Sequence, residues 1–217
     1  MSKELRVRIR FTEEVLGTAN SDKDIHEEYI ASKAPDAPSR EEEVAALGVD
    51  EVVAKGKTIF HRNAEGKPIL WDYQIKGFFK SAAQAGSYVG GDAKLAGYKK
   101  KIDLLVFVNE RQIVLNVPDG MEMGDCQRPL RAQTMQGERV ALANSETCPA
   151  GTEAEFTIKV LDDGLMKYVL QWLDYGALNG IGAWRNSSKG RYVWDLLNDA
   201  GEVIGGNRRD YEAKNAK

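Results

Sequence analysis

The residue types best suited to chemistry gather in one glycine-rich stretch, residues 175–192. Glycine lets the backbone adopt a positive φ and approach a ligand closely. Basic side chains supply charge, amides and hydroxyls supply hydrogen bonds, and aromatic rings supply flat faces for stacking. This mixture suits a loop that holds a flexible, anionic, base-bearing strand. The alternative is a glycine-rich β-hairpin in which Trp184 caps the core. The candidate binding residues of this stretch are Trp184, Arg185, Asn186, Ser187, Lys189 and Arg191.

Two phosphate-binding motifs are excluded for this stretch. No G-x-x-x-x-G-K-[ST] sequence occurs, and Lys189 precedes the last glycine instead of following it. The pair Gly180 and Gly182 is followed by Arg185 where the dinucleotide fingerprint requires a third glycine. We therefore expect no nucleotide cofactor.

Residues that could support catalysis are few. The only histidines, His26 and His61, are isolated, and Cys126 and Cys148 are not at a metal-ligand spacing. We therefore predict a protein that is not an enzyme, with no catalytic residue, bound metal or cofactor. Two cysteines fit a reducing cytoplasm, where a disulfide is compatible with the sequence but not implied by it.

Composition and charge indicate a globular protein with one acidic segment. The 217 residues carry a net charge of −3. Residues 12–53 contain twelve acidic and three basic residues, which leaves +6 for the rest of the chain. A modestly basic body is compatible with nucleic-acid binding but is far from the pI above about 9 of a strong duplex binder. No signal peptide is apparent at the N-terminus and no apolar run reaches the length of a membrane span, so we expect no membrane partner.

The elements that would position the glycine-rich stretch follow from hydrophobic periodicity. Strict alternation predicts strands at 5–11 and 154–160, and apolar residues at i, i+3 and i+4 predict helices at about 72–83 and 164–175. Further strands are expected at 58–61, 69–71, 102–108, 113–117 and 191–197, and short helices at 20–30 and 39–47. The segments 86–101 and 128–145 are expected to be loop-like and extended, respectively. The order strand, helix, strand, strand, helix, strand predicts an α+β, ferredoxin-like antiparallel sheet with helices on one face.

The inserts in this order set the expected domain boundaries. We expect a single domain over residues 1–204 with an acidic helical insert at about 18–56. The residues from Gly205 to the C-terminus are expected to be frayed. On the first strand, Arg6, Arg8 and Arg10 would share the outward face, either as a solvated surface or beneath a nucleic-acid backbone.

Three separated segments resemble the RAMP superfamily, the RNA-binding subunits of CRISPR effector complexes, and most of all the backbone subunit of type III complexes. Residues 72–80 (DYQIKGFFK) resemble the motif after that family's first strand, residues 148–158 (CPAGTEAEFTI) the beginning of a later strand, and residues 180–192 its C-terminal glycine-rich loop. The chain departs from the motifs at Tyr73 and Gln74, where serines are usual, at Lys80, where arginine is usual, and at Lys189. The sequence also resembles uncharacterised bacteriophage and prophage proteins, which suggests a stand-alone relative.

The resemblance implies RNA binding without base readout, by subunits that stack along the strand. Outside the glycine-rich stretch, the basic residues expected to contact phosphates are Lys76, Lys80, Arg128 and Arg131. Tyr192, like Trp184, offers a stacking surface, whereas Trp71, Trp172 and Trp194 are expected in the core. Asp22 and Asp24 fall near the position of a family aspartate that cleaves RNA with a metal ion, but their neighbours indicate an ordinary charged helix start.

We therefore predict a cytoplasmic protein that binds single-stranded nucleic acid, RNA before DNA, and self-associates along it. The alternative is a phage interaction protein that binds a host defence or CRISPR complex, or that sequesters a nucleotide signal. A metal-dependent endoribonuclease is a third possibility, resting on Asp22 and Asp24.

Overall fold

The computed structural model describes residues 3–20, 57–134 and 137–215. Its centre is a five-stranded sheet in the order β13-β12-β1-β11-β7. Strand β1 pairs antiparallel with β11 on one side and with β12 on the other, and β7 pairs antiparallel with β11. The elements of this unit follow the expected order: β1 (Lys3–Phe11), α4 (Asp72–Val89), β7 (Val106–Val108), β11 (Glu153–Val160), α6 (Met166–Tyr175) and β12 (Tyr192–Leu197). Taken in chain order, the four strands lie in the sheet as 4-1-3-2, so the predicted ferredoxin-like α+β fold is confirmed.

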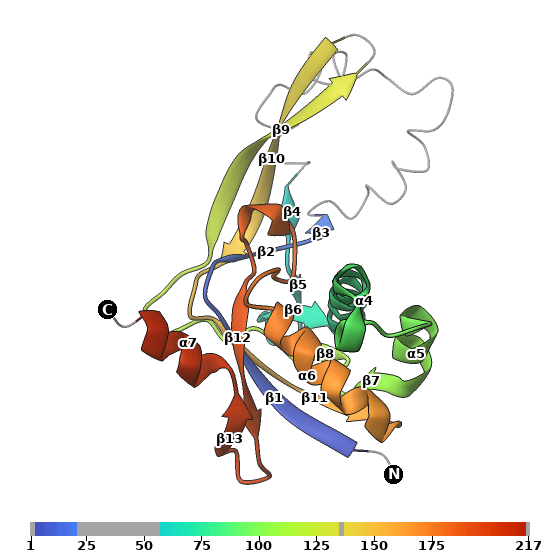
Figure 1. Cartoon of the computed structure of the whole chain (residues 1–217). Helices are drawn as coiled ribbons and strands as arrows, with labels where there is room; N and C mark the ends of the chain where they lie inside the picture. Colours follow the sequence, from blue (N-terminus) through green and yellow to red (C-terminus); the bar gives the residue numbers. More distant parts are fainter. Residues whose placement is uncertain (1–2, 21–56, 135–136, 216–217) are drawn as a thin grey trace.

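Helices α4 and α6 cover the face of the sheet to which the alternating apolar residues point. In β1, Val7, Ile9 and Phe11 are buried while the arginines between them are not. On α4, Ile75, Phe79 and the other apolar residues of the i, i+3, i+4 pattern are buried against the sheet. Figure 1 shows α4 and α6 on one side of β1 and β12, and α7 (Arg208–Asn215) on the other. The predicted periodicity therefore identified the core face correctly.

Two small sheets extend the unit. One has the order β2-β10-β4-β3, and the other β5-β6-β8. In the first, β10 also pairs with β9 along a long antiparallel hairpin that projects from the body (Figure 1). Their strands are β2 (Val15–Leu16), β3 (Ala19–Asn20), β4 (Thr58–Ile59), β5 (His61–Arg62), β6 (Pro68–Trp71), β8 (Gln112–Val114), β9 (Gly124–Thr134) and β10 (Gly137–Cys148). The extended segment expected from residue 128 is thus the greater part of a β-hairpin.

The segment expected as a strand at 102–108 begins as a helix. Helix α5 spans Tyr98–Leu105, and only Val106–Val108 forms strand β7. The lysines before Ile102 favour a helix, in which Ile102 is buried while Leu104 remains exposed. A short apolar run cannot distinguish a strand from a buried helix end by periodicity. The expected loop at 86–101 is likewise shortened by α4, by a turn of 3₁₀ helix at Gly91–Ala93, and by α5.

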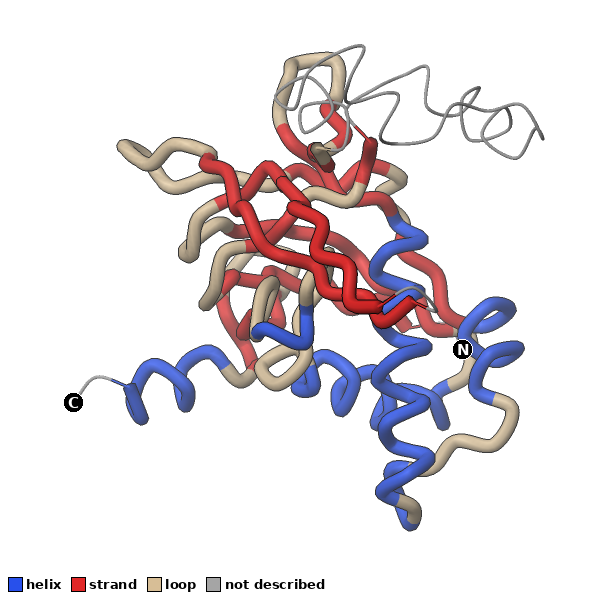
Figure 2. The backbone as a smooth tube through the Cα atoms, turned by 90° about the horizontal axis from the view of Figure 1, so that it is seen from above, coloured by secondary structure: helices blue, strands red, loops and turns tan. Residues whose placement is uncertain are grey.

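The C-terminal residues form structure where fraying is expected. Strand β13 (Val203–Gly206) pairs with β12, and α7 follows it. Arg208 anchors α7, since its Nη1 lies 3.2 Å from Asp195 Oδ2 and 3.0 Å from Glu153 Oε1. In the view from above, α7 lies apart from the other helices (Figure 2). Sequence composition missed this helix because α7 has no apolar face and depends on ion pairs.

The expected helices at 20–30 and 39–47, and with them nearly all of the acidic insert, lie outside the described residues. Within the described residues, no helix is long and apolar enough to cross a membrane.

Candidate nucleic-acid interface

The glycine loop (residues 176–191) connects α6 to β12. Its glycines mainly allow two backbone segments of the loop to pack closely against each other. Gly190 has φ +69°, and a Cβ placed there would lie 1.8 Å from the Ile181 carbonyl oxygen. A Cβ on Gly180 would lie 2.0 Å from the Gly190 carbonyl carbon. The N–H of Ile181 donates to the Gly190 carbonyl over 2.9 Å, which fixes this crossing. The glycines therefore serve close backbone packing, and the loop is not the β-hairpin considered from its sequence.

A short 3₁₀ helix, Arg185–Ser187, forms the outer part of the glycine loop between two strained residues. Trp184 has φ +56° and Ser188 has φ +66°, and both lie in the left-handed region. A bulky residue in this region is an outlier that costs on the order of 1–3 kcal/mol and often marks a functional position. Asn186 and Ser187 are exposed on this turn. With this backbone conformation, the side chain of Trp184 lies against Arg128 of the long hairpin.

Arg128 of β9 lies against the ring of Trp184 and so joins the long hairpin to the glycine loop. Its guanidinium carbon lies 5.2 Å from the centre of the Trp184 ring, within cation–π range. Its Nη1 donates to Ser145 Oγ over 3.0 Å, while its buried Nε has no hydrogen-bond partner among the side chains and backbone that the structure describes. Arg128 is only 9% exposed. Burying a guanidinium whose described partners are a hydroxyl and a ring is costly, so an anion bound here would be favoured.

Arg185 lines an open pocket of about 270 Å³ between the glycine loop and α4. Its Nη1 lies 3.5 Å from Ser81 Oγ, at the limit of a hydrogen bond. Among the residues whose side chains the structure describes, neither Arg185 nor Arg128 has a carboxylate partner. The other lining residues come from α4, the β2–β3 turn and the loop itself: Thr18, Gln74, Gly77, Phe78, Ile181 and Gly182.

The three lysines expected to contact phosphates, Lys76, Lys80 and Lys189, already make polar contacts within the fold. Lys80 Nζ lies 2.7 Å from Asp103 Oδ1, and this hydrogen bond lowers the pKa of Asp103. Lys76 donates to the Asp103 carbonyl over 3.2 Å and lies 4.9 Å from the centre of the Phe107 ring. Both lysines thus turn toward α5 and away from the glycine loop.

Lys189 belongs to the glycine loop but pairs with Glu14 at the other end of the chain. The hydrogen bond to Glu14 raises the pKa of Lys189 above its ordinary value. Its charge is therefore neutralised within the fold, and the ion pair ties the loop to the segment between β1 and β2.

The remaining sequence candidates fall in different places. The Arg191 carbonyl accepts hydrogen bonds from the N–H and hydroxyl of Thr12, while its buried Nε has no partner among the described residues. Arg131 lies on β9 opposite Val140, and its side chain is not among those that the structure describes.

Asp22 and Asp24 lie outside the described residues, so cleavage stays a prediction. Among the described residues, no group of histidine, cysteine and acidic side chains could hold a metal ion.

Two aromatic expectations are wrong. Tyr192 is buried and packs edge-on against Phe11 and Phe78, so it offers no stacking surface. Burial raises the pKa of its hydroxyl well above the ordinary value. Trp71 is only half-buried, whereas Trp172 and Trp194 are in the core as expected.

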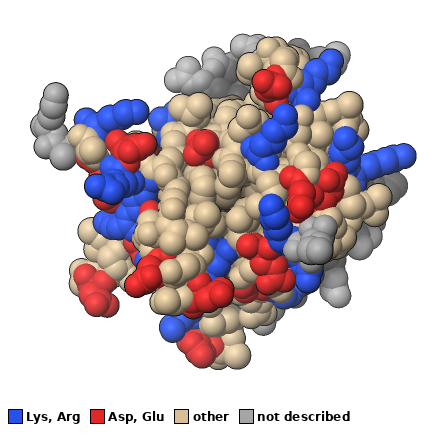
Figure 3. Space-filling model, turned by 60° about the horizontal axis from the view of Figure 1, so that its bottom comes forward, with Lys and Arg blue, Asp and Glu red and all other residues tan. Residues whose placement is uncertain are grey.

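On the open face of the sheet, the arginines of β1 form ion pairs with the glutamates of β11. Glu155 lies between Arg6 and Arg8, at 3.1 and 2.6 Å. Burial alone would raise the pKa of Glu155, but the hydrogen bonds from these arginines lower it. Arg10 Nη1 lies 3.8 Å from Glu153. Figure 3 likewise shows basic and acidic side chains interspersed on the face that it presents, with no continuous basic patch.

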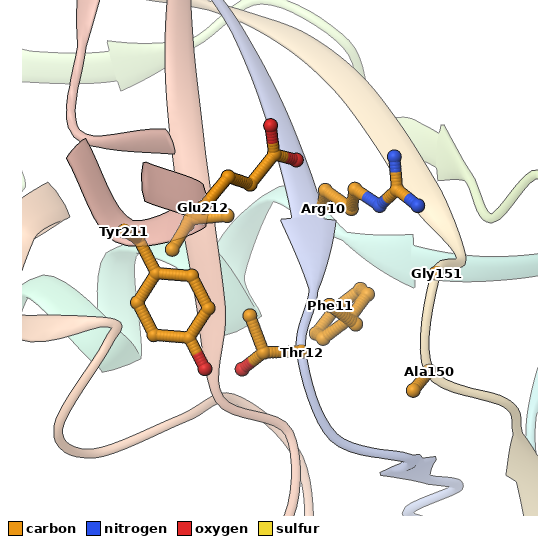
Figure 4. A pocket seen from close by; sticks show the side chains of 8 residues that line it. Arg10, Phe11, Thr12, Ala150, Gly151, Tyr211 and Glu212 are labelled. Atoms are coloured by element: carbon orange, nitrogen blue, oxygen red, sulfur yellow. The ribbon is translucent and has the colours of Figure 1, made fainter. Parts of the chain in front are cut away.

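A second open pocket, of about 330 Å³, lies on this face beneath α7. Figure 4 shows Tyr211 and Glu212 of α7 beside Arg10 and Thr12. The pocket holds one carboxylate, Glu212, beside one guanidinium, Arg10, so it is less suited to a phosphate than the pocket that Arg185 lines. The arginines of β1 are therefore weaker candidates than Arg185 and Arg128.

The structure thus places Trp184, in contact with Arg128, next to Arg185, which faces an α4 surface that was not expected. Gln74, Gly77 and Ser81 lie on one face of α4 at i, i+3 and i+7, beside the buried stripe. The helical period would have placed them together, but nothing in the sequence indicated that the glycine loop packs against this face.

Comparisons with known proteins bear on the fold. No protein-family model and no curated protein matches the chain. Among solved structures, 132 chains match. One is a chain in the cryo-EM structure of the type III-B Cmr-beta bound to cognate target RNA, with a TM-score of 0.53 and 8% identity. The match covers 91% of this chain and 59% of that chain. At this identity the likeness shows the fold alone, and it is consistent with the ferredoxin-like fold described above.

Proposed function

We propose that the protein binds single-stranded RNA through its phosphate backbone, at the junction of the long hairpin, the glycine loop and α4. The observation that carries this proposal is the contact of Arg128 with Trp184 next to Arg185, which lines an open pocket. Two guanidinium groups without described carboxylate partners attract phosphates, and an indole ring offers a stacking surface. The RNA-bound structure with a similar fold supports RNA over DNA.

The contacts favour binding without base readout. Arginine pairs with phosphates whatever the sequence, and stacking on an aromatic ring tolerates every base. A pocket of about 270 Å³ that is open to solvent suits one passing nucleotide better than an enclosed small ligand.

Fluorescence anisotropy with labelled strands of one length tests this function. We expect single-stranded RNA to bind more tightly than the matching duplex, and unlabelled single strands of unrelated sequence to compete equally. Single-stranded DNA of the same sequence measures the preference for RNA. If no single strand binds while a cyclic nucleotide from a panel does, the function is sequestration of a signal and the proposal is wrong.

We propose binding without cleavage. RNA incubated with the protein and Mg²⁺ or Mn²⁺ should remain whole over the time of a binding measurement. Discrete products that disappear in Asp22→Ala or Asp24→Ala would instead identify a metal-dependent endoribonuclease.

A further inference from the structure

An aromatic cluster at the start of α4 lies next to the pocket and has no part in the contacts described so far. The rings of Trp71 and Tyr73 are nearly parallel, at 12°, with centres 6.4 Å apart. The guanidinium carbon of Arg111 lies 5.4 Å from the centre of the Trp71 ring and 5.9 Å from that of Tyr73. His61 meets Trp71 edge-on, with ring centres 5.6 Å apart. We call Trp71, Tyr73 and Arg111 the aromatic platform.

The aromatic platform is held in place yet open to solvent. Arg111 Nη1 lies 2.6 Å from Asp72 Oδ1, and the Arg111 carbonyl accepts from the Asp72 N–H over 3.3 Å. These contacts fix the guanidinium over the rings. Tyr73 nevertheless remains 53% exposed. A large aromatic side chain held rigid on the surface loses little entropy when it stacks on a ligand.

The platform continues the surface of the pocket along α4. Tyr73 precedes the pocket residue Gly77 by four positions, so the two are neighbours on the helix surface, about 6 Å apart. Gln74 joins the two regions: its Oε1 accepts from the Trp71 N–H over 2.7 Å, and its Nε2 donates to Thr18 Oγ1 over 3.0 Å. No Cβ blocks the helix at Gly77, where an added one would meet nothing within 4 Å. The helix surface between Tyr73 and the pocket that Arg185 lines therefore carries no side chain at Gly77.

We propose that the aromatic platform is a second stacking site, which holds an unpaired base of the strand whose backbone passes Arg185. This proposal rests on the proposed function. Parallel rings with a guanidinium above them present flat, polarisable faces, which nucleobases recognise by stacking. The platform accepts any base, because none of its described contacts reads the hydrogen-bonding edge of a base.

Tyr73→Ala tests the platform with two ligands of equal charge. One is a single-stranded RNA, and the other is the same sugar-phosphate strand with abasic sites in place of its bases. We expect Tyr73→Ala to weaken binding of the base-bearing strand about tenfold and to leave the abasic strand unchanged. Tyr73→Trp should restore binding. The matched control is Tyr88→Ala, which removes a tyrosine 84% exposed on the same helix and should change neither affinity.

The outcomes separate the platform from the binding function. If the wild-type protein binds the base-bearing strand and Tyr73→Ala binds it equally well, the platform proposal is wrong and the function stands. Equal losses for both strands would show that Tyr73 acts on the backbone and not on a base, which also overturns the proposal. If the wild-type protein binds no strand, both proposals are wrong.

Discussion

Arg185 and Lys189 lie four residues apart in the glycine loop, but the structure predicts opposite roles for them. From the sequence, both are expected to contact phosphates. Lys189 is paired with Glu14, whereas Arg185 faces the pocket and Ser81 without a described carboxylate partner. Replacing Arg185 with alanine should therefore remove a phosphate contact, and neutralising Lys189 should not.

The salt dependence of binding gives the magnitude. For a single strand, each phosphate contact contributes about −0.7 to the slope of log Kobs against log[salt]. Arg185→Ala should make the slope shallower by about 0.7. When the salt concentration is raised fourfold, both proteins lose affinity. The factor by which the variant loses affinity should be about 2.5-fold smaller than the factor for the wild-type protein.

The comparison requires a variant of Lys189 that keeps the loop in place. Lys189→Ala alone would leave the Glu14 carboxylate unpaired beside the loop and would weaken binding by repulsion. In the double variant Glu14→Gln with Lys189→Gln, both charges are removed and a hydrogen bond can remain. We expect its salt slope to match that of the wild-type protein. A slope flattened as much as in Arg185→Ala, with an unchanged circular dichroism spectrum, would refute the distinction between paired and unpaired cations.

Three further predictions concern stability, reactivity and assembly. Arg208→Ala should lower the free energy of unfolding by about 2 kcal/mol near neutral pH, because it leaves the nearly buried Asp195 without its partner. Burial raises the pKa of Asp195 despite Arg208, so protonation of Asp195 should relieve the penalty as the pH falls. Urea unfolding should therefore show a smaller loss of stability at acidic pH than at neutral pH, and the control variant Arg209→Ala should show no loss at either pH. Iodoacetamide should modify Cys126 but not the native protein's Cys148, since burial raises the pKa of Cys148 to about 12; two alkylated cysteines in the native mass spectrum would contradict this. Light scattering with RNA strands of increasing length should show mass rising stepwise as subunits add along the strand, and one protein per strand at every length would exclude that assembly.

The sequence predicted the elements that have a clear hydrophobic period. Strands β1 and β11 alternate strictly, and α4 and α6 carry apolar residues at helical spacing, so their burial follows from a local rule. Helix α5 was missed because its end is a short apolar run. Helix α7 was missed because it has no apolar face. It is held to the sheet by the ion pair between its residue Arg208 and Asp195.

The candidate site depended on contacts that no local pattern contains. Arg128 and Trp184 come into contact only once the fold has placed β9 beside the glycine loop. Lys189 and Glu14 are 175 residues apart, so their ion pair could not be seen in the loop sequence. The composition of the glycine loop predicted phosphate contacts, but it could not tell which cations the fold itself would neutralise.

The distribution of paired charges also determines which side of the sheet can hold a strand. In RNA-binding sheets of related topology, aromatic residues on the open face stack the bases. Here the outward residues of β1 are arginines paired with Glu153 and Glu155, and α7 lies over part of that face. A strand bound there would have to break these ion pairs and would find no described aromatic row in their place. The side formed by the glycine loop and the start of α4 requires no such exchange, because Arg128 and Arg185 have no described acidic partner and Tyr73 is open to solvent. Binding should therefore occur at the helical edge of the sheet, and variants of the β1 arginines should affect stability before they affect affinity.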